Sequence, residues 1–150
     1  MITAIDPDLR KSGVCTIDDE GNILLLKSMS AIELIEYVKA NPDHVYGIED
    51  VNKIGAMYAT HKHRNPRIAA NIAQKVGMVK GVATLIAQLI DACTGREPIM
   101  CPVGLGKQIK NNAALFKKLT GYQGSTNEDT RDAYAIATWI LSEKIKCNRN

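Results

Sequence analysis

The sequence predicts an α/β domain, built on a mixed five-stranded sheet with helices on its faces. Its first third reads as three short apolar strands separated by turn residues, which is the pattern of an antiparallel meander. Further along, short apolar segments alternate with segments of helical period, which favours parallel strands joined by helices. The chain has 150 residues, enough for one domain with its own core, so we expect a single domain over 1–150.

The predicted meander consists of strands over 2–6, 13–18 and 23–27. The "DEGN" segment between the second and third strands contains residues typical of a tight reversal. The first strand ends on Asp6, and a turn follows. An ionised carboxylate at the end of a buried strand costs several kcal/mol to desolvate, so Asp6 is predicted either to stabilise the turn or to bind a cation.

Capping residues mark the helices of the middle segment. Ser30 and Glu33 form a capping box, which predicts a helix that ends near Asn41-Pro42. A fourth strand is expected over 45–51, "VYGIEDV". Asn65-Pro66 then begins a long helix to about Cys93, whose apolar stripe comprises Ile68, Ile72, Val76, Val79, Ala83, Ile86 and Ile90.

The last third is expected to hold one more strand and two helices. The strand is "PIMCPV", and the segment "KQIKNNAALFKKL" predicts one amphipathic helix that ends at Gly121. Ser125 and Glu128 have the spacing of a second capping box. The final helix that follows is expected to turn Ile136, Trp139 and Ile140 inward.

The charge of +3 is unevenly distributed along the chain. Residues 1–50 carry four Lys/Arg and ten Asp/Glu, whereas residues 51–127 carry eleven and two. A basic middle segment has two interpretations of equal weight, a solvated face or a surface for a polyanion such as a nucleic acid.

Several classes of protein are not indicated by the sequence. No apolar run approaches the roughly 18 residues of a membrane span, and no secretory signal pattern is evident. We therefore expect a cytoplasmic protein, in a bacterial cell or a virus-infected host cell, with no membrane partner. The four cysteines have neither CxxC spacing nor a histidine at a metal-ligand interval. A zinc site and a disulfide framework are therefore not predicted.

Carboxylates stand at the ends of elements that are far apart in sequence. Asp6 ends the first strand, Glu49 and Asp50 end the fourth, and Asp129 and Asp132 share one face of the final helix. If the two strands are parallel neighbours, these acids converge, and hard divalent cations such as Mg²⁺ or Mn²⁺ would relieve their repulsion. Each acid alone also fits a turn or a helix cap; the joint pattern favours a metal site.

Four segments carry a likeness to a known family, and they follow its order over most of the chain: "AIDPDLRKSGV", "YGIEDV", "VKGVATLIA" and "EDTRDAYAIA". Together they resemble the RuvC family of Holliday junction resolvases, which belong to the RNase H-like superfamily. The resemblance implies a homodimer that cuts four-way DNA junctions with two Mg²⁺ ions per active site, leaving a 3′ hydroxyl and a 5′ phosphate. Mn²⁺ is a plausible substitute for Mg²⁺.

Carried over by position, the resemblance implies roles for individual residues. Asp6, Glu49, Asp129 and Asp132 would be catalytic residues and metal ligands. Lys107 falls near the family's basic residue beside the scissile phosphate, and Lys110 is its rival. The chain departs from the family at Asp8, where glycine is usual. It also departs in the long basic segment "KIGAMYATHKHRNPR", which suggests a viral or otherwise diverged branch.

Basic and aromatic residues outside the carboxylate cluster are candidates for DNA contact. The candidates are Arg10, Lys11, Lys53, Tyr58, Lys62, Arg64, Arg67 and Lys110. Tyr58 could stack on a base or face the core. The small residues of "GMVKG" in the long helix could form part of a dimer interface or pack on the sheet within one chain.

Two alternative functions share the predicted fold. A nuclease for other branched DNA or for structured RNA would use the same acids. A nucleic-acid-binding module without catalysis would keep the shape alone, although the complete set of acids disfavours it.

Overall fold

The computed structural model describes residues 1–53 and 65–147. The candidate DNA contacts Tyr58, Lys62 and Arg64 lie outside the described residues. The described strands are β1 (Ile2–Asp6), β2 (Ser12–Ile17), β3 (Ile23–Met29), β4 (Val45–Glu49) and β5 (Ile99–Cys101). The helices are α1 (Ala31–Ala40), the short 3₁₀ helix η1 (Val51–Lys53), α3 (Pro66–Thr94), α4 (Lys107–Lys110), α5 (Ala113–Thr120) and α6 (Glu128–Cys147).

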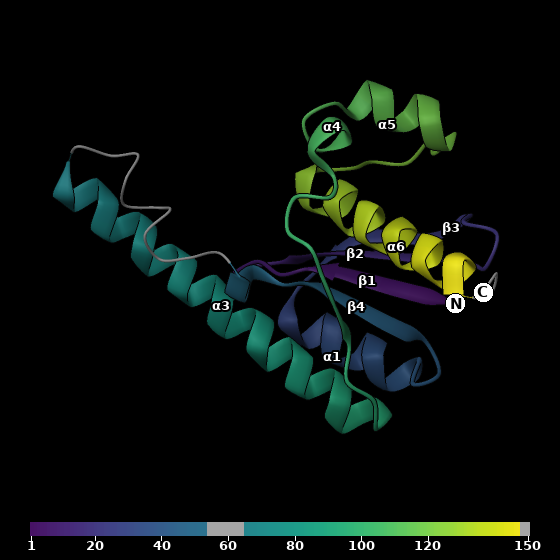
Figure 1. Cartoon of the computed structure of the whole chain (residues 1–150), viewed down its shortest axis with the longest axis horizontal. Coiled ribbons are helices and arrows are strands. Elements are labelled where there is room, and N and C mark those ends of the chain that lie inside the picture. The colour runs from purple at the N-terminus through teal and green to yellow at the C-terminus, as the bar shows by residue number, and fades with distance from the viewer. Residues whose placement is uncertain (54–64, 148–150) are drawn as a thin grey trace.

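The strands form one mixed sheet in the order β3-β2-β1-β4-β5 (Figure 1). The three strands of the meander pair antiparallel, while β1 and β4, and then β4 and β5, pair parallel. The predicted five-stranded α/β sheet is therefore confirmed. The parallel pairing of β1 with β4 also fulfils the condition under which their terminal acids meet.

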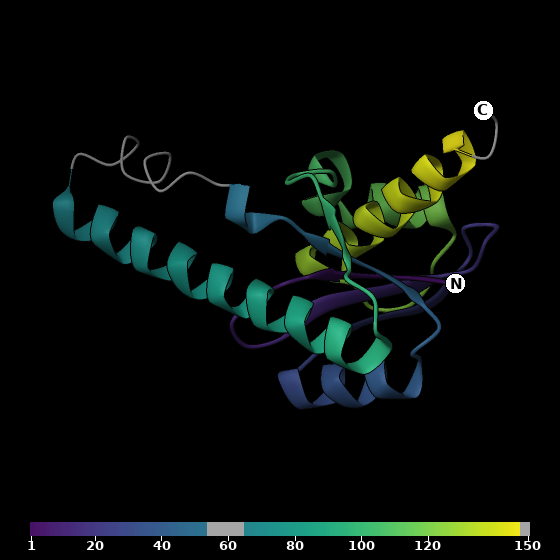
Figure 2. The ribbon, with the colours of Figure 1, turned by 60° about the horizontal axis from the view of Figure 1, so that its bottom comes forward.

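Helices cover both faces of the sheet (Figures 1 and 2). On one face, α1 and α3 pack over a core that includes Ile5, Val14 and Ile48. On the other face, α6 lies across the strands, and its Ile136 and Ile140 join a second core with Ile2 and Ala4. Alternation along β1 thus sends even-numbered side chains toward α6, the direction that Asp6 shares.

The helix signals in the first half of the chain are confirmed. Ser30 accepts a hydrogen bond from the amide of Glu33, whose side chain in turn accepts from the amide of Ser30. Asn65 caps α3 with Pro66 at its first position. Both helices end where the sequence predicts, α1 at Ala40 and α3 at Thr94.

Two predictions for the second half are wrong. The segment predicted as one helix is divided into α4 and α5, because Asn112 accepts a hydrogen bond from the amide of Leu115 and so begins a new helix. The final helix is capped by Asn127 instead of Ser125. The Asn127 side chain accepts from the amide of Thr130, and the Thr130 hydroxyl accepts from the amide of Asn127. The predicted box paired Ser125 with Glu128, whereas the observed box pairs Asn127 with Thr130.

The apolar stripe of α3 is buried only along its C-terminal half. Ala83, Ile86 and Ile90 are buried in the core, whereas Ile68 is exposed and Ile72 and Val76 are half-buried. Figure 1 shows the reason: the N-terminal half of α3 extends beyond the sheet. Among the described residues, no atom outside the backbone of α3 itself and the neighbouring residues lies within 4 Å of a Cβ placed on Gly77 or Gly81, so these glycines do not serve close packing on the sheet.

By length and composition α3 is also able to cross a membrane, since an 18-residue window has a mean hydropathy of 1.5 and is 17% buried. This corrects the expectation that no segment comes close to a membrane span. The match rests on length and composition alone, and the buried side of α3 packs in the protein core.

A buried polar network joins three elements on the side of the sheet away from the carboxylates. The Thr3 hydroxyl lies 2.8 Å from that of Thr16 and 2.9 Å from Nδ1 of His44. Thr16 continues the network to the Tyr37 hydroxyl at 2.7 Å. Burial lowers the pKa of His44 from its ordinary value of 6.5, and the nearby N-terminal ammonium adds to the effect.

The lowered pKa of His44 predicts a loss of stability in acid. Below about pH 6.5 the unfolded chain binds a proton that the native histidine does not, so the contribution of His44 is complete above that pH and declines below it. Urea unfolding of the wild type and of His44→Gln between about pH 5 and pH 7 checks this. The wild type should lose stability relative to the variant as the pH falls, and a constant difference would contradict the prediction.

Candidate active site

The first two acids of the site come from adjacent parallel strands. The register between β1 and β4 pairs Ile5 with Ile48, so Asp6 and Glu49 occupy the next positions on the two strands. Both side chains project to the face covered by α6, since Gly47, two residues before Glu49, faces Ile140 of α6. The two carboxylates therefore share one end and one face of the sheet.

The first turns of α6 bring the other two acids to the same place. Gly13 pairs with Asp6 across β1 and β2. A Cβ on Gly13 would lie 2.8 Å from the amide nitrogen of Thr130 and closer still to the carbonyl of Asp129. Only a glycine at this position lets the start of α6 approach the strand that neighbours Asp6.

The pKa of Asp6 reflects its burial and the charges of the nearby acids. Burial, followed by the charges of Glu49 and Asp132, raises the pKa of Asp6 from 3.8 to about 8. The pKa of Asp129 is also raised, first by burial and then by the charge of Asp8. Asp6 is 8% exposed and Asp132 is 5% exposed, so water does little to screen their mutual repulsion.

Lys110 supplies a positive charge within the cluster. Its ammonium forms an ion pair with Oδ2 of Asp132. Burial lowers the pKa of Lys110, but the contact with Asp132 and the charges of Asp6 and Glu49 outweigh it and raise the pKa overall. The other oxygen of Asp132, Oδ1, is buried and has no hydrogen-bond partner among residues 1–53 and 65–147.

Glu49 is held by the loop that follows β5. Its Oε1 accepts a hydrogen bond from the amide of Gly104 at 2.9 Å. Asp50, which the sequence also placed at the end of this strand, forms an ion pair with Lys53 at 3.2 Å instead. Asp8 is exposed, and its Oδ2 accepts from the amide of Arg10.

The donor set fits hard divalent cations. Four carboxylates approach one another, and burial together with the charges of its neighbours raises the pKa of Asp6. Among the described residues, Oδ1 of Asp132 is buried without a hydrogen-bond partner. Oxygen ligands of this kind are those preferred by Mg²⁺ and Mn²⁺. Within the described residues, no three of these side chains are already arranged as a ready cage for one ion, and the ammonium of Lys110 holds one of the oxygens.

The structure separates the two rival lysines. Lys110 reaches Asp132, whereas Lys107 is exposed, and none of the ion pairs in the described part of the chain includes it. Four candidate DNA contacts are exposed: Arg10, Lys11, Lys53 and Arg67. Arg10 and Lys11 lie in the loop directly after Asp6, and Lys53 follows the end of β4, so these three flank the carboxylates.

Three functional features escaped the sequence reasoning. Gly13 admits α6 to the sheet, Gly104 donates to Glu49, and the buried Arg131 contacts the chain at Lys110. The glycine in "KSGV" was a usable signal, because a glycine inside a strand often marks a close approach of another backbone. The arginine gave no such signal, since basic residues on helices are usually solvated.

Comparison with known proteins gives one informative result. No protein-family model matches the chain, and no curated protein matches it by sequence. Among solved structures, RuvC of T. thermophilus in complex with Holliday junction substrate matches 97% of this chain and 96% of its own, with a TM-score of 0.54 and 17% identity. The chain has a RuvC-like fold. At 17% identity this likeness shows the arrangement of the chain alone. In that arrangement the carboxyl ends of β1 and β4 lie near the start of α6.

Proposed function

We propose that this protein is a Mg²⁺-dependent endonuclease that resolves four-way DNA junctions by hydrolysing phosphodiester bonds. The observation that carries the proposal is the convergence of Asp6, Glu49, Asp129 and Asp132 on one end of the sheet. The raised pKa of Asp6, to about 8, adds support, because strongly shifted carboxylates cluster at functional sites. The RuvC-like fold and the flanking basic residues favour a branched DNA as the substrate.

The residues divide into three roles. Asp6, Glu49 and Asp132 would hold the cations, with Asp129 assisting at the same face of α6. Two divalent cations held there would supply activation of a water nucleophile and stabilisation of the leaving oxygen. Lys110 would neutralise the charge that develops on the phosphate. Arg10, Lys11 and Lys53 would contact neighbouring phosphates, which positions the substrate without reading its sequence.

A cleavage panel tests the proposed function. A mobile four-way junction, a flap, a fork, a DNA duplex and an RNA duplex are incubated with the protein, with Mg²⁺ and with EDTA. We expect paired nicks in the junction that require Mg²⁺. Preference for the flap or for RNA would replace the junction specificity with one of the alternative substrates and leave the chemistry intact. No cleavage of any substrate would contradict the nuclease.

Lys110 is predicted to matter more than Lys107. Lys110→Ala should lower the single-turnover rate by about a hundredfold, since it removes a positive charge placed beside the reacting phosphate. Lys107→Ala is the matched control and should cost less than about threefold, because Lys107 is exposed and belongs to none of the ion pairs formed by the described residues. Equal losses in the two variants would contradict the assignment of Lys110.

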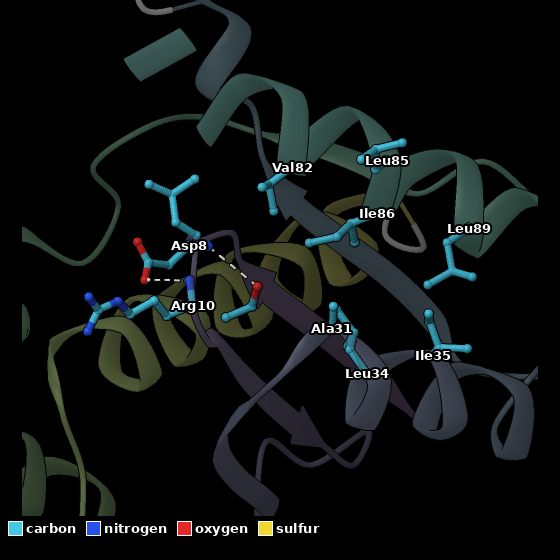
Figure 3. A pocket seen from close by; sticks show the side chains of 11 residues that line it. Asp8, Arg10, Ala31, Leu34, Ile35, Val82, Leu85, Ile86 and Leu89 are labelled. Atoms are coloured by element: carbon cyan, nitrogen blue, oxygen red, sulfur yellow. Dashed lines mark hydrogen bonds between the residues drawn. The ribbon is translucent and has the colours of Figure 1, made fainter. Parts of the chain in front are cut away.

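A homodimer is the proposed functional unit, because two symmetric nicks require two related sites. A groove of about 370 Å³ between α1 and α3 supports it, with a lining that includes Leu34, Ile35, Val82 and Leu89 (Figure 3). Leu85, also in this lining, is 65% exposed. Apolar surface of this kind on α3 is suited to a second copy of the chain.

The oligomeric state can be measured by sedimentation velocity. We expect a dimer for the wild type and a monomer for Leu85→Lys, which places a charge on the groove. The same charge at Leu24, which is 56% exposed on β3, should leave the dimer intact. A wild-type monomer throughout the micromolar range would contradict this proposal.

A further inference from the structure

Arg131 is a buried charge whose hydrogen bonds all go to uncharged groups. It is 6% exposed, and none of the ion pairs formed by the described residues includes it. Its Nε donates to the carbonyl oxygen of Lys110 at 2.7 Å, and its Nη2 donates to the same oxygen. Its Nη1 donates to the Thr126 hydroxyl at 2.9 Å. Burying a guanidinium in this way is costly, so its contacts call for a functional reason.

The carbonyl that Arg131 binds is the one at which the predicted helix breaks. In a continuous helix over 107–119 the Lys110 carbonyl would accept from the amide of residue 114. Here it accepts two donors from Arg131, and α5 begins afresh at the cap residue Asn112. Arg131 therefore holds the end of α4 against α6.

Arg131 and Asp132 are consecutive residues of α6 that bind the same lysine in two different ways. Arg131 binds the main chain of Lys110, and Asp132 binds its ammonium. Fixing the main chain of Lys110 reduces the number of conformations in which its side chain moves away from Asp132.

We propose that Arg131 is a positioning residue, which fixes the main chain of Lys110 so that the lysine ammonium stays at Asp132. Its consequence for catalysis rests on the proposed function, whereas the positioning itself does not. The planar fork of arginine suits this role, because it binds one carbonyl through two donors and still reaches Thr126. A lysine in its place offers a single point of attachment and cannot reproduce both contacts.

Chemical labelling of lysines tests the positioning directly. The metal-free protein is treated briefly with an amine-acylating reagent, and the rate at each lysine is read by mass spectrometry, with the exposed Lys117 as internal reference. In Arg131→Gln and Arg131→Lys the rate at Lys110 should rise about tenfold relative to Lys117, because the ammonium is no longer held at Asp132.

Arg96→Gln is the matched control, since the Arg96 guanidinium also donates to backbone carbonyls, those of Pro42 and His44, far from the site. It should leave the Lys110 rate unchanged. An unchanged Lys110 rate in folded Arg131→Gln, with or without a lower melting temperature, would overturn the proposal. If Arg131→Gln does not fold, Arg131→Lys, which keeps the charge and most of the volume, decides by the same criterion.

A double-mutant cycle connects the positioning to catalysis. Arg131→Gln should slow junction cleavage in the wild-type background and add no further loss when Lys110 is already alanine. Additive losses would show that Arg131 does not act through Lys110. A protein that cleaves nothing but still shows the labelling change would refute the proposed function and leave the positioning role standing.

Discussion

Replacing Asp6 by asparagine is expected to abolish junction cleavage while junction binding persists. The pKa of Asp6 is raised by its burial and by the charges of Glu49, Asp132 and Asp129. The loss of Asp6 therefore removes the carboxylate shared by the whole cluster. We expect the cleavage rate to fall by about a thousandfold or more under single-turnover conditions. Binding, followed by gel shift in EDTA, should change less than about threefold, since the phosphate-contacting residues are untouched.

Asp50→Asn is the matched control for this change. Asp50 is adjacent to Glu49 and is buried, but it pairs with Lys53 outside the cluster. Its replacement should leave cleavage within about threefold of the wild type. Cleavage by Asp6→Asn at the wild-type rate would rule out a catalytic role for Asp6.

Asp6→Asn is also expected to stabilise the metal-free protein, and the gain in stability over the wild type should grow with pH. Native Asp6 keeps its proton up to about pH 8, whereas the unfolded aspartate loses it near 3.8. Between these values the native state binds more protons, so the wild type loses stability as the pH rises and asparagine does not. Urea unfolding in EDTA between about pH 5 and pH 8 measures the difference. A difference that shrinks with pH would contradict the assignment.

Gly13→Ala is the second change with a large expected effect. A Cβ at this position collides with the backbone of Asp129 and Thr130. Backbone atoms cannot relieve the collision by a rotamer change, as a flexible side chain can. Either α6 moves away from β2 or the strand distorts, and we expect a loss of about 3 kcal/mol in the free energy of unfolding. Because the displaced turn carries Asp129, cleavage should fall as well, by more than the folded fraction explains.

The control is Gly81→Ala, where a new Cβ meets no tertiary neighbour within 4 Å in the part of the chain that the structure describes. In the middle of α3 this change should be neutral or stabilising by about 0.5–1 kcal/mol, because alanine is the better helix former. Equal unfolding free energies for Gly13→Ala and the wild type would show that α6 does not depend on the glycine.

The carboxylate cluster could be predicted from sequence because it follows from rules of strand geometry. Asp6 and Glu49 each end a short apolar segment, and parallel neighbours place such ends together. Asp129 and Asp132 share a helix face by their spacing alone. Each of these inferences requires only local periodicity and one topological assumption, which the pairing of β1 with β4 confirms.

The supporting residues could not be predicted, because their roles depend on contacts between distant segments. Lys107 and Lys110 are separated by one helical turn, and only the three-dimensional position of Asp132 distinguishes them. The break between α4 and α5 combines the local cap at Asn112 with hydrogen bonds from Arg131, 21 residues further along the chain. Helical periodicity over 107–119 contains no trace of that interaction, so the sequence favours one continuous helix.

The central claim is that the gathered acids form a binding site for divalent cations, and a Mn²⁺ titration followed by electron paramagnetic resonance tests it most directly. At about pH 8, where Asp6 is partly ionised, the wild type should bind two ions per chain, and Asp6→Asn should lose this binding. Proton release should accompany binding in the wild type. Failure of the wild type to bind Mn²⁺ at millimolar concentration, or equal binding by Asp6→Asn, would contradict the account.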